Sequence, residues 1–144
     1  MFSPGAGCTR AQVVTFLWRA AGEPQPKSEN NPFADVQKGQ YYYKAVLWAV
    51  EKGITTGTSP TTFRPDQTCT RGQIVTFLWR YFGEPEPKTG NNPFEDVKDS
   101  DYFYKAVLWA VENGITTGTT ATTFRPEQTC TRAQIVTFLY RAMR

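Results

Sequence analysis

The chain has 144 residues, of which 40% are apolar and 20% are charged, as is typical of soluble globular domains. Its 16 basic and 13 acidic residues give a net charge of +3 without forming a Lys/Arg run, so we expect no nucleic-acid partner. The chain contains no His, the commonest general base and metal ligand near neutral pH, so we expect no enzyme, no metal site and no cofactor.

A repeat of 61 residues organises the chain: Cys8, Cys69 and Cys130 are this far apart, and residues 31–82 and 92–143 agree at about three quarters of their positions. Each repeat has two halves, and residues 1–4 align with residues 62–65. We therefore expect one second half and two full repeats, at residues 1–22, 31–83 and 92–144, within one compact module. A further first half would be lost upstream or supplied by another chain.

A helix is predicted at the start of the chain, after Thr9, and the same pattern returns after Thr70 and Thr131. Each of these threonines is followed three residues later by Gln, which is a capping box. Cys69 and Ile74 have the spacing of a hydrophobic staple across the start of the second of these helices. This spacing predicts that the cysteines are buried and reduced. A zinc site formed by the three cysteines is the weaker alternative, because they lack close pairing.

The first half of each repeat predicts another helix, over residues 41–52 and again over residues 102–113. These segments are apolar around most of the helix circumference, so we expect core helices, with the tryptophans packed inside. Gly53 followed by Ile54 predicts a Schellman end. Residues 55–58 and 63–65 are expected to form an ordered loop.

Arginine occupies the first helical position three times, as Arg10, Arg71 and Arg132. A cation in the first turn opposes the helix dipole by about 0.3–1 kcal/mol, so fold stability alone does not favour it. Together with open amides at the helix start, each guanidinium would suit a carboxylate or phosphate on a ligand. The alternative is that Arg71 and Arg132 pair with Asp35, with Asp96 or with a neighbouring repeat. On the ligand interpretation, Arg71→Ala and Arg132→Ala would weaken binding with little change in melting temperature.

Clusters of aromatic residues begin each first-half helix, and in each cluster at least one ring should belong to the core. Tyr41 and Tyr102 could offer flat faces and hydroxyls to sugar rings. Asp35 and Asp96 are expected chiefly to fix a loop through backbone hydrogen bonds, with a groove-lining role as the alternative.

The motifs together resemble the S-layer homology (SLH) domain. The resemblance rests on residues 33–36, Tyr41, residues 45–46, 53–54, Gly57, residues 63–65 and 70–73 in order, and on their repetition at 94–97 through 131–134. It implies an all-α fold in which tandem two-helix repeats form a three-pronged, pseudo-threefold spindle with grooves between the prongs. It also implies non-covalent binding of an acidic, often pyruvylated, secondary cell-wall polysaccharide.

On this resemblance we expect nine ligand-binding residues: Arg10, Arg71, Arg132, Tyr41, Tyr102, Asp35, Asp96, Gly57 and Gly118. The family motif usually ends in Glu where this chain has Gln73, and the family often has Trp where this chain has Tyr41. Both departures leave the identity of the glycan open.

The expected location is the bacterial cell surface or cell wall, as part of a longer secreted chain. No stretch approaches the roughly 20 apolar residues of a membrane span. The start of the chain also lacks a secretory signal pattern, so residence inside the cell is the alternative. The main rival function is a protein-interaction or self-assembly module of the cell envelope, with a homo-oligomer formed through the missing half-repeat. A third alternative is an enzyme, which would need a pair of carboxylates in a groove.

Overall fold

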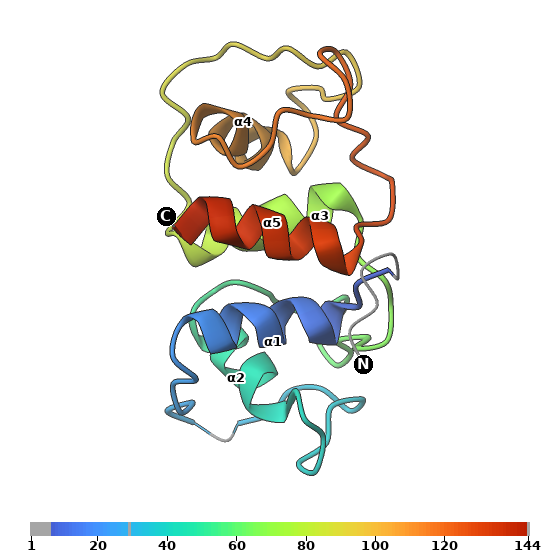
Figure 1. Ribbon diagram of the computed structural model, residues 1–144. Coiled ribbons are helices and arrows are strands. Elements are labelled where there is room, and N and C mark those ends of the chain that lie inside the picture. Colours follow the sequence, from blue (N-terminus) through green and yellow to red (C-terminus); the bar gives the residue numbers. More distant parts are fainter. Residues whose placement is uncertain (1–6, 29, 144) are drawn as a thin grey trace. The chain divides into compact units, whose positions relative to one another are not determined.

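A computed structural model of the protein describes residues 7–28 and 30–143. Within these residues the chain forms α-helices and isolated antiparallel bridges but no strand, so the predicted all-α class is confirmed. The helices are α1 (Arg10–Ala20), α2 (Tyr43–Glu51), α3 (Arg71–Tyr81), α4 (Tyr104–Glu112) and α5 (Arg132–Met143) (Figure 1). The residues aligned with 62–65, Met1 to Pro4, lie outside the described part of the chain.

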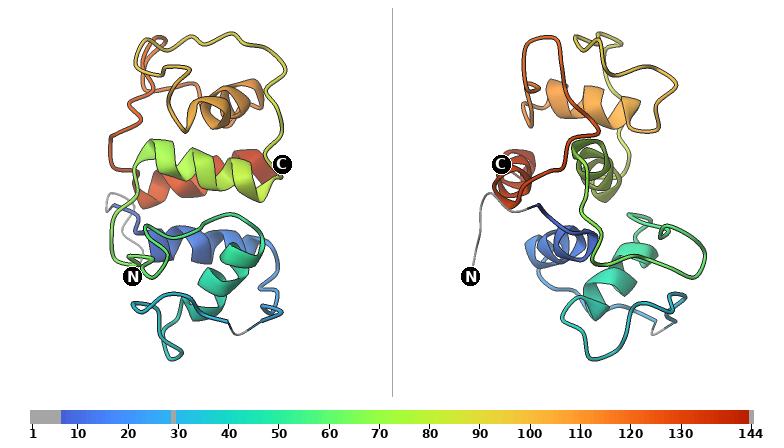
Figure 2. Two further views of the ribbon diagram at one scale, coloured as in Figure 1. Left: turned by 180° about the vertical axis from the view of Figure 1, so that it is seen from behind. Right: turned by 90° about the vertical axis from the view of Figure 1, so that its right-hand side faces the viewer.

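The chain divides into two compact units whose borders differ from those of the sequence repeats. The N-terminal unit is Cys8–Thr68, in which α1 packs against α2. The C-terminal unit is Cys69–Arg144 together with Met1–Gly7, and in it α3 packs against both α4 and α5 (Figures 1 and 2). Each pair α1–α2 and α3–α4 therefore joins the second half of one repeat to the first half of the next.

The predicted capping boxes are present at the starts of α1 and α3. The amide of Gln12 donates to the Thr9 hydroxyl at 3.2 Å, and the amide of Thr9 donates to the Gln12 side chain at 2.9 Å. Thr70 and Gln73 make the same pair of bonds. Cys8, Cys69 and Cys130, each one residue before a cap, are fully buried, as the staple pattern predicts.

The helices α1 and α3 each receive at their N-terminus the loop of the following repeat. The amides of Arg10 and Ala11 donate to the carbonyl oxygens of Gln67 and Pro65 at 2.8 and 3.0 Å. In the C-terminal unit the corresponding amides of α3 donate to the carbonyl oxygens of the loop that follows α4. Backbone from about 55 residues downstream thus satisfies amides that a helix start otherwise leaves without intrahelical partners.

The first-half helices begin two residues later than expected, at Tyr43 and Tyr104. The amide of Tyr43 donates to the Gln40 carbonyl, so residues 40–43 form a turn before the helix starts. The Schellman end is confirmed: the amides of Gly53 and Ile54 donate to the carbonyls of Val50 and Ala49, and Gly53 has a φ of +73°.

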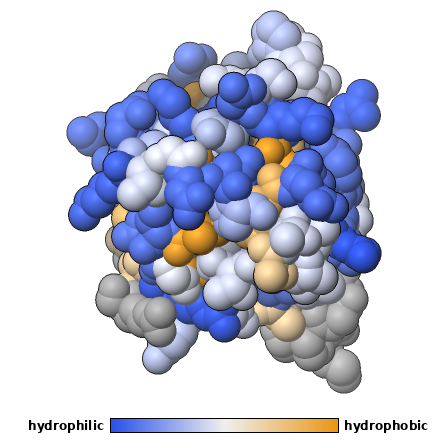
Figure 3. Space-filling view, turned by 90° about the horizontal axis from the view of Figure 1, so that it is seen from above, coloured by the Kyte–Doolittle hydropathy of each residue, from blue (hydrophilic) through white to orange (hydrophobic). Residues whose placement is uncertain are grey.

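The core contains one ring from each aromatic cluster, Tyr42 and Phe103, and both Trp48 and Trp109 are buried as predicted. Trp18 and Trp79 lie partly buried, and the indole of Trp18 donates to the Pro24 carbonyl. The face shown in Figure 3 is largely hydrophilic, with only small apolar spots. The buried side chains of the described residues are mostly apolar.

Gly57 offers a test of how tightly the loop packs on the core. Its φ is +88°, and a Cβ would lie 2.5 Å from Phe33 Cε1 and 2.7 Å from the Thr62 carbonyl oxygen. We expect Gly57→Ala to lower the free energy of unfolding by about 2–4 kcal/mol, through left-handed strain and overpacking. Thermal denaturation measures this. Gly53→Ala, with positive φ but open space, should cost about 1 kcal/mol, and Gly39→Ala should be neutral; equal effects for all three would contradict the packing.

The end of α4 anchors the connector that precedes its repeat. The Glu112 carboxylate accepts hydrogen bonds from the amides of Lys88 and Thr89, both at 2.8 Å, and from the Thr89 hydroxyl at 3.0 Å. The Thr89 amide, followed by the Lys88 amide, lowers the pKa of Glu112 below its usual value of 4.5. The carboxylate is therefore the form that the folded chain prefers.

We expect Glu112→Gln to lower the melting temperature at neutral pH and to lose this effect in acid. A depressed folded-state pKa contributes stability above the unfolded pKa, and this contribution disappears as pH falls through the folded value. Melting curves of both proteins from pH 7 down to pH 2.5 measure the difference. Glu95→Gln, at an exposed position, is the control. A Glu112→Gln deficit that stays constant with pH would contradict the role of the ionised carboxylate.

Candidate functional site

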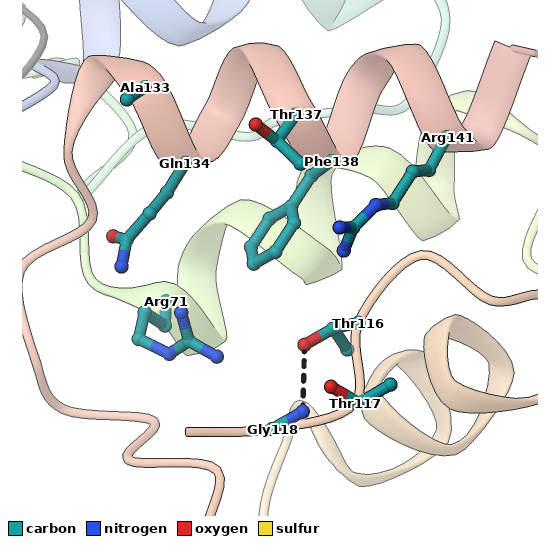
Figure 4. A pocket seen from close by; sticks show the side chains of 9 residues that line it. All are labelled: Arg71, Thr116, Thr117, Gly118, Ala133, Gln134, Thr137, Phe138 and Arg141. Atoms are coloured by element: carbon teal, nitrogen blue, oxygen red, sulfur yellow. Dashed lines mark hydrogen bonds between the residues drawn. The ribbon is translucent and has the colours of Figure 1, made fainter. Parts of the chain in front are cut away.

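A groove of about 240 Å³ lies within the C-terminal unit, between α5 and the loop at residues 116–118 (Figure 4). Its walls come from α5, from this loop and from the first residue of α3. The lining residues are Arg71, Thr116, Thr117, Gly118, Ala133, Gln134, Thr137, Phe138 and Arg141. The groove thus brings together two of the residues predicted to bind ligand, Arg71 and Gly118.

The loop wall of the groove is held by short-range polar contacts and by a glycine. The Gly118 amide donates to the Thr116 hydroxyl at 3.0 Å, and Thr116 is buried. Gly118 has a φ of +92°, and a Cβ there would collide with the Phe94 ring and with the Thr123 carbonyl oxygen. Glycine is therefore required for the loop to approach the core closely, and Gly118 lies in the wall of the groove.

Arg71 lies at the floor of the groove, with only 3% of its surface exposed. Its Nε donates to the Phe124 carbonyl at 2.8 Å, and its guanidinium carbon lies 4.6 Å from the centre of the Phe124 ring and 5.4 Å from that of Phe138. Burial lowers the pKa of Arg71, while Cys130 and Asp96 raise it. An arginine remains protonated in proteins, so a desolvated positive charge lies beside this groove.

Arg141 supplies a second positive charge to the groove and was not among the predicted site residues. Its Nη1 donates to the Ile115 carbonyl at 3.2 Å, and Figure 4 shows its guanidinium turned toward the space below α5. The sequence carried a signal for it, because Arg19 and Arg80 occupy the same place in their helices. These two form i,i+4 ion pairs with Glu23 and Glu84, at 4.0 and 3.9 Å.

The groove lining contains two arginines and no acidic side chain, which favours a negatively charged ligand. Another hollow in the same unit is lined by Asp96, Asp101 and Glu127 as well as by Lys98 and Arg125. Because acidic and basic side chains are mixed in this second hollow, its lining does not favour a negatively charged ligand. The groove beside α5 is therefore the better candidate for binding an anion.

Arg10 is also buried, with 5% of its surface exposed. Its Nε donates to the Phe63 carbonyl at 2.7 Å, its Nη2 donates to the Thr55 hydroxyl at 3.5 Å, and its guanidinium carbon lies 4.7 Å from the centre of the Phe63 ring. Arg10 and Arg71 thus hold the following loop against their helices. Arg71 thus contacts the following repeat, which agrees with the alternative of pairing with a neighbouring repeat.

The expectation of open amides beside these arginines is wrong for α1 and α3. The first two amides of α3, of Arg71 and Gly72, donate to the carbonyls of Gln128 and Pro126, both at 2.9 Å. The amide of Gln73 donates to the capping hydroxyl of Thr70. A ligand at the groove would therefore contact side chains rather than the amides of the helix start.

Arg132, the third predicted arginine, lies in a different environment at the start of α5. Its side chain is partly exposed, and its Nε is buried without a hydrogen-bond partner in the part of the chain that the structure describes. It does not line the groove, although its neighbours Ala133 and Gln134 do.

Asp35 and Asp96 fix the loops, as predicted. The two carboxylate oxygens of Asp35 accept from the amides of Phe63 and Arg64 at 2.9 and 2.8 Å, and those of Asp96 make the same two bonds one repeat later. Neither carboxylate lines the groove beside α5. The two carboxylates thereby fix the loops whose Phe63 and Phe124 carbonyls accept from Arg10 and Arg71.

Tyr41 and Tyr102 are each 59% exposed and pack edge-on against Tyr42 and Phe103, with ring centres 5.0 Å apart. Burial near the hydroxyl raises the pKa of Tyr102, Glu127 raises it further, and a hydrogen bond with Thr70 lowers it. The rings offer open faces, but Tyr102 does not line the groove.

No helix in the described residues is both long and apolar enough to cross a membrane. Among residues 7–28 and 30–143, no group of three or more Cys, Asp or Glu side chains is arranged to hold a metal ion.

The repeats match the model of the S-layer homology domain at residues 32–75 and 93–136, which together exceed half of the chain. The chain belongs to the S-layer homology domain family. Among its relatives, an endoglucanase of Bacillus sp. (strain KSM-635) is 36% identical over 123 residues, which cover 85% of this chain and 13% of that protein.

Two further relatives are named as surface or anchoring proteins. An S-layer protein of Bacillus thuringiensis subsp. finitimus is 29% identical over 96% of this chain and 17% of its own length. A cellulosome-anchoring protein of Acetivibrio thermocellus is 23% identical over 99% of this chain and 33% of its own length. The chain thus spans a third or less of these relatives.

The S-layer homology domain is a non-catalytic anchoring module of cell-surface proteins, and this family membership indicates a location at the cell surface or cell wall. Relatives that carry enzyme names are much longer proteins in which the matching region is a small part.

The burial of Arg71 changes what its substitution should do. We expect Arg71→Ala to lower the free energy of unfolding by about 2–4 kcal/mol, because it removes a charged hydrogen bond and two cation–π contacts. The expectation of a nearly unchanged melting temperature is therefore revised for this residue. Thermal denaturation measures the change in stability. Lys98→Ala, which also removes one positive charge, is the control. A melting temperature within 1 °C of the parent's would contradict the structural role.

Proposed function

We propose that this SLH domain attaches a larger surface protein to the bacterial cell wall by binding an anionic secondary cell-wall polysaccharide in the groove beside α5. The observation that carries the proposal is the lining of that groove, in which Arg71 and Arg141 are the charged residues and no acidic side chain is present. A carboxylate or phosphate on a sugar would offset the cost of desolvating the Arg71 guanidinium.

The remaining lining suits a sugar. Thr117, Gln134 and Thr137 bring side chains that can exchange hydrogen bonds with hydroxyl groups, and Phe138 offers an apolar ring. Gln134 also caps α5 by accepting from the Thr131 amide at 2.9 Å, so its position is fixed before a ligand arrives. A preorganised polar wall reduces the entropy lost on binding.

The other predicted residues take different roles in this proposal. Asp96 and Gly118 shape the loop wall of the groove, and Asp35 and Gly57 hold the corresponding loop of the N-terminal unit in place. Tyr41 and Tyr102 would stack against sugar rings of a longer chain outside the groove, because their faces are exposed. Arg10 and Arg132, which were predicted to bind ligand, do not line the groove. Arg141 is the second cation of the site in this proposal.

Arg141 is the residue whose substitution best separates binding from folding, because it is partly exposed and makes one bond to a backbone carbonyl. We expect Arg141→Gln to weaken co-sedimentation with purified wall sacculi by about tenfold, as the loss of one charged contact worth about 1.4 kcal/mol implies. Lys98→Gln removes the same charge from the other hollow of this unit and should leave binding unchanged. Equal losses for both variants would indicate a general charge effect and contradict the groove.

The polymer itself is tested by stripping the secondary polysaccharide from the sacculi before sedimentation. Binding that requires the polymer supports the proposal. Undiminished binding to stripped sacculi, or binding only to a protein of the envelope, would favour the protein-interaction module instead.

A further inference from the structure

Two cysteines of the C-terminal unit lie opposite each other across a short antiparallel contact. Thr70 and Thr129 pair in an antiparallel bridge. One residue farther from this bridge on each segment, the Cys130 amide donates to the Cys69 carbonyl at 2.9 Å. Directly opposed residues that share such a bond have Cα atoms about 5.5 Å apart, and their side chains leave the backbone on the same face of the pair.

This backbone geometry suits a disulfide, which joins cysteines whose Cα atoms lie about 4.4–6.8 Å apart. The structure holds Cys69 and Cys130 as two thiols, and both side chains are fully buried. The Sγ of Cys130 donates to the carbonyl of Thr131 at 3.7 Å. A covalent bond between the two sulfurs would therefore require rotation of the side chains and no large movement of the backbone.

The pair lies next to the groove beside α5. Cys69 stands two residues before Arg71, and Cys130 stands three residues before Ala133, both of which line the groove. Burial lowers the pKa of Arg71, and Cys130 is the first of the groups that raise it, so the sulfur lies near the guanidinium. Because α3 and α5 contact each other (Figure 2), a bond between the cysteines would join the starts of two packed helices.

The location of the family favours oxidation of this pair. S-layer homology domains act at the cell surface or cell wall, and disulfides persist outside the cytoplasm. Access of an oxidant to a sulfur controls the rate of the reaction, and both sulfurs are enclosed in the folded unit. The bond should therefore form while the chain folds, before the sulfurs are enclosed.

We infer that Cys69 and Cys130 form a disulfide cross-link within the C-terminal unit when the chain folds in the presence of a low-molecular-weight disulfide. The first thiolate attacks this oxidant and releases one small thiol, and the second thiolate attacks the mixed disulfide and releases the other. The two cysteines lose their protons and together two electrons, which reduce the oxidant to two thiols. This inference does not depend on the polysaccharide proposal.

The cross-link would stabilise the unit by restricting its unfolded state. It closes a loop that contains residues 70–129, and with it α3 and α4. Because a long closed loop removes much of the conformational freedom of the unfolded chain, we expect the melting temperature to rise by about 10 °C.

The test refolds the full chain from denaturant in a mixture of oxidised and reduced glutathione. Digestion without reduction should yield a peptide containing Cys69 joined to one containing Cys130, identified by mass spectrometry. The melting temperature of this sample is compared with that of the same protein refolded in a thiol reductant. The oxidised sample should be the more stable of the two.

Cys8→Ala is the matched control, because it removes a buried cysteine of the same repeat position and leaves the pair intact. It should keep both the joined peptides and the difference in melting temperature. Cys69→Ala and Cys130→Ala should each lose that difference. Every variant is compared with its own reduced form, so the cost of the substitution itself does not enter. If either of these two fails to fold, Cys8→Ala alone decides, since its remaining thiols are the proposed pair.

Three outcomes would overturn the inference. The first is a refolded chain whose cysteines all react with an alkylating reagent once it is denatured. The second is a bond that involves Cys8 or that joins two chains on a non-reducing gel. The third is a cross-link between Cys69 and Cys130 that lowers the melting temperature, because the folded backbone would then not accommodate it.

Discussion

The structure depends on one interaction that is made twice, between the first arginine of a helix and a phenylalanine 53 residues later. In each case the Nε donates to the phenylalanine carbonyl and the guanidinium lies over the same ring. The contact fastens the loop of one repeat to the helix of the preceding repeat. This contact explains why each compact unit combines parts of two repeats. It also explains why a cation is tolerated at a helix start, where the helix dipole disfavours it, because the carbonyl and the ring face stabilise the guanidinium.

The features that the sequence predicted well are those that depend on neighbours within a few residues. The capping box at Thr70 and Gln73 and the Schellman end at Gly53 and Ile54 are short-range hydrogen-bond patterns with fixed spacing. The buried state of the cysteines followed from the same spacing. The loop-fixing role of Asp35 is confirmed too, because a carboxylate in such a loop has backbone amides as its nearest donors.

The features that could not be predicted involve pairs far apart along the chain. The position of Arg71 at a helix start suggested an anion site with open amides, but its amide and its Nε are both used by residues 124–128. Nothing local to Arg71 reveals that loop. Arg141 was not predicted because its counterparts have local partners. Arg19 and Arg80 each pair with the Glu four residues later, a pattern that indicates a surface ion pair rather than a ligand site.

On the proposed function, Arg71 is both a structural and a ligand-binding residue, and its geometry is compatible with the two roles. The bond to Phe124 and the two aromatic rings fix the orientation of the guanidinium, so little conformational entropy remains to be lost when an anion arrives. The same burial removes water from the charge, which strengthens its attraction for an anion in the groove. Arg141, partly exposed on the last turn of α5, is not constrained in this way and can adjust to the ligand. A fixed cation beside an adaptable one would let repeats of one design keep their core while the groove accommodates different acidic sugars.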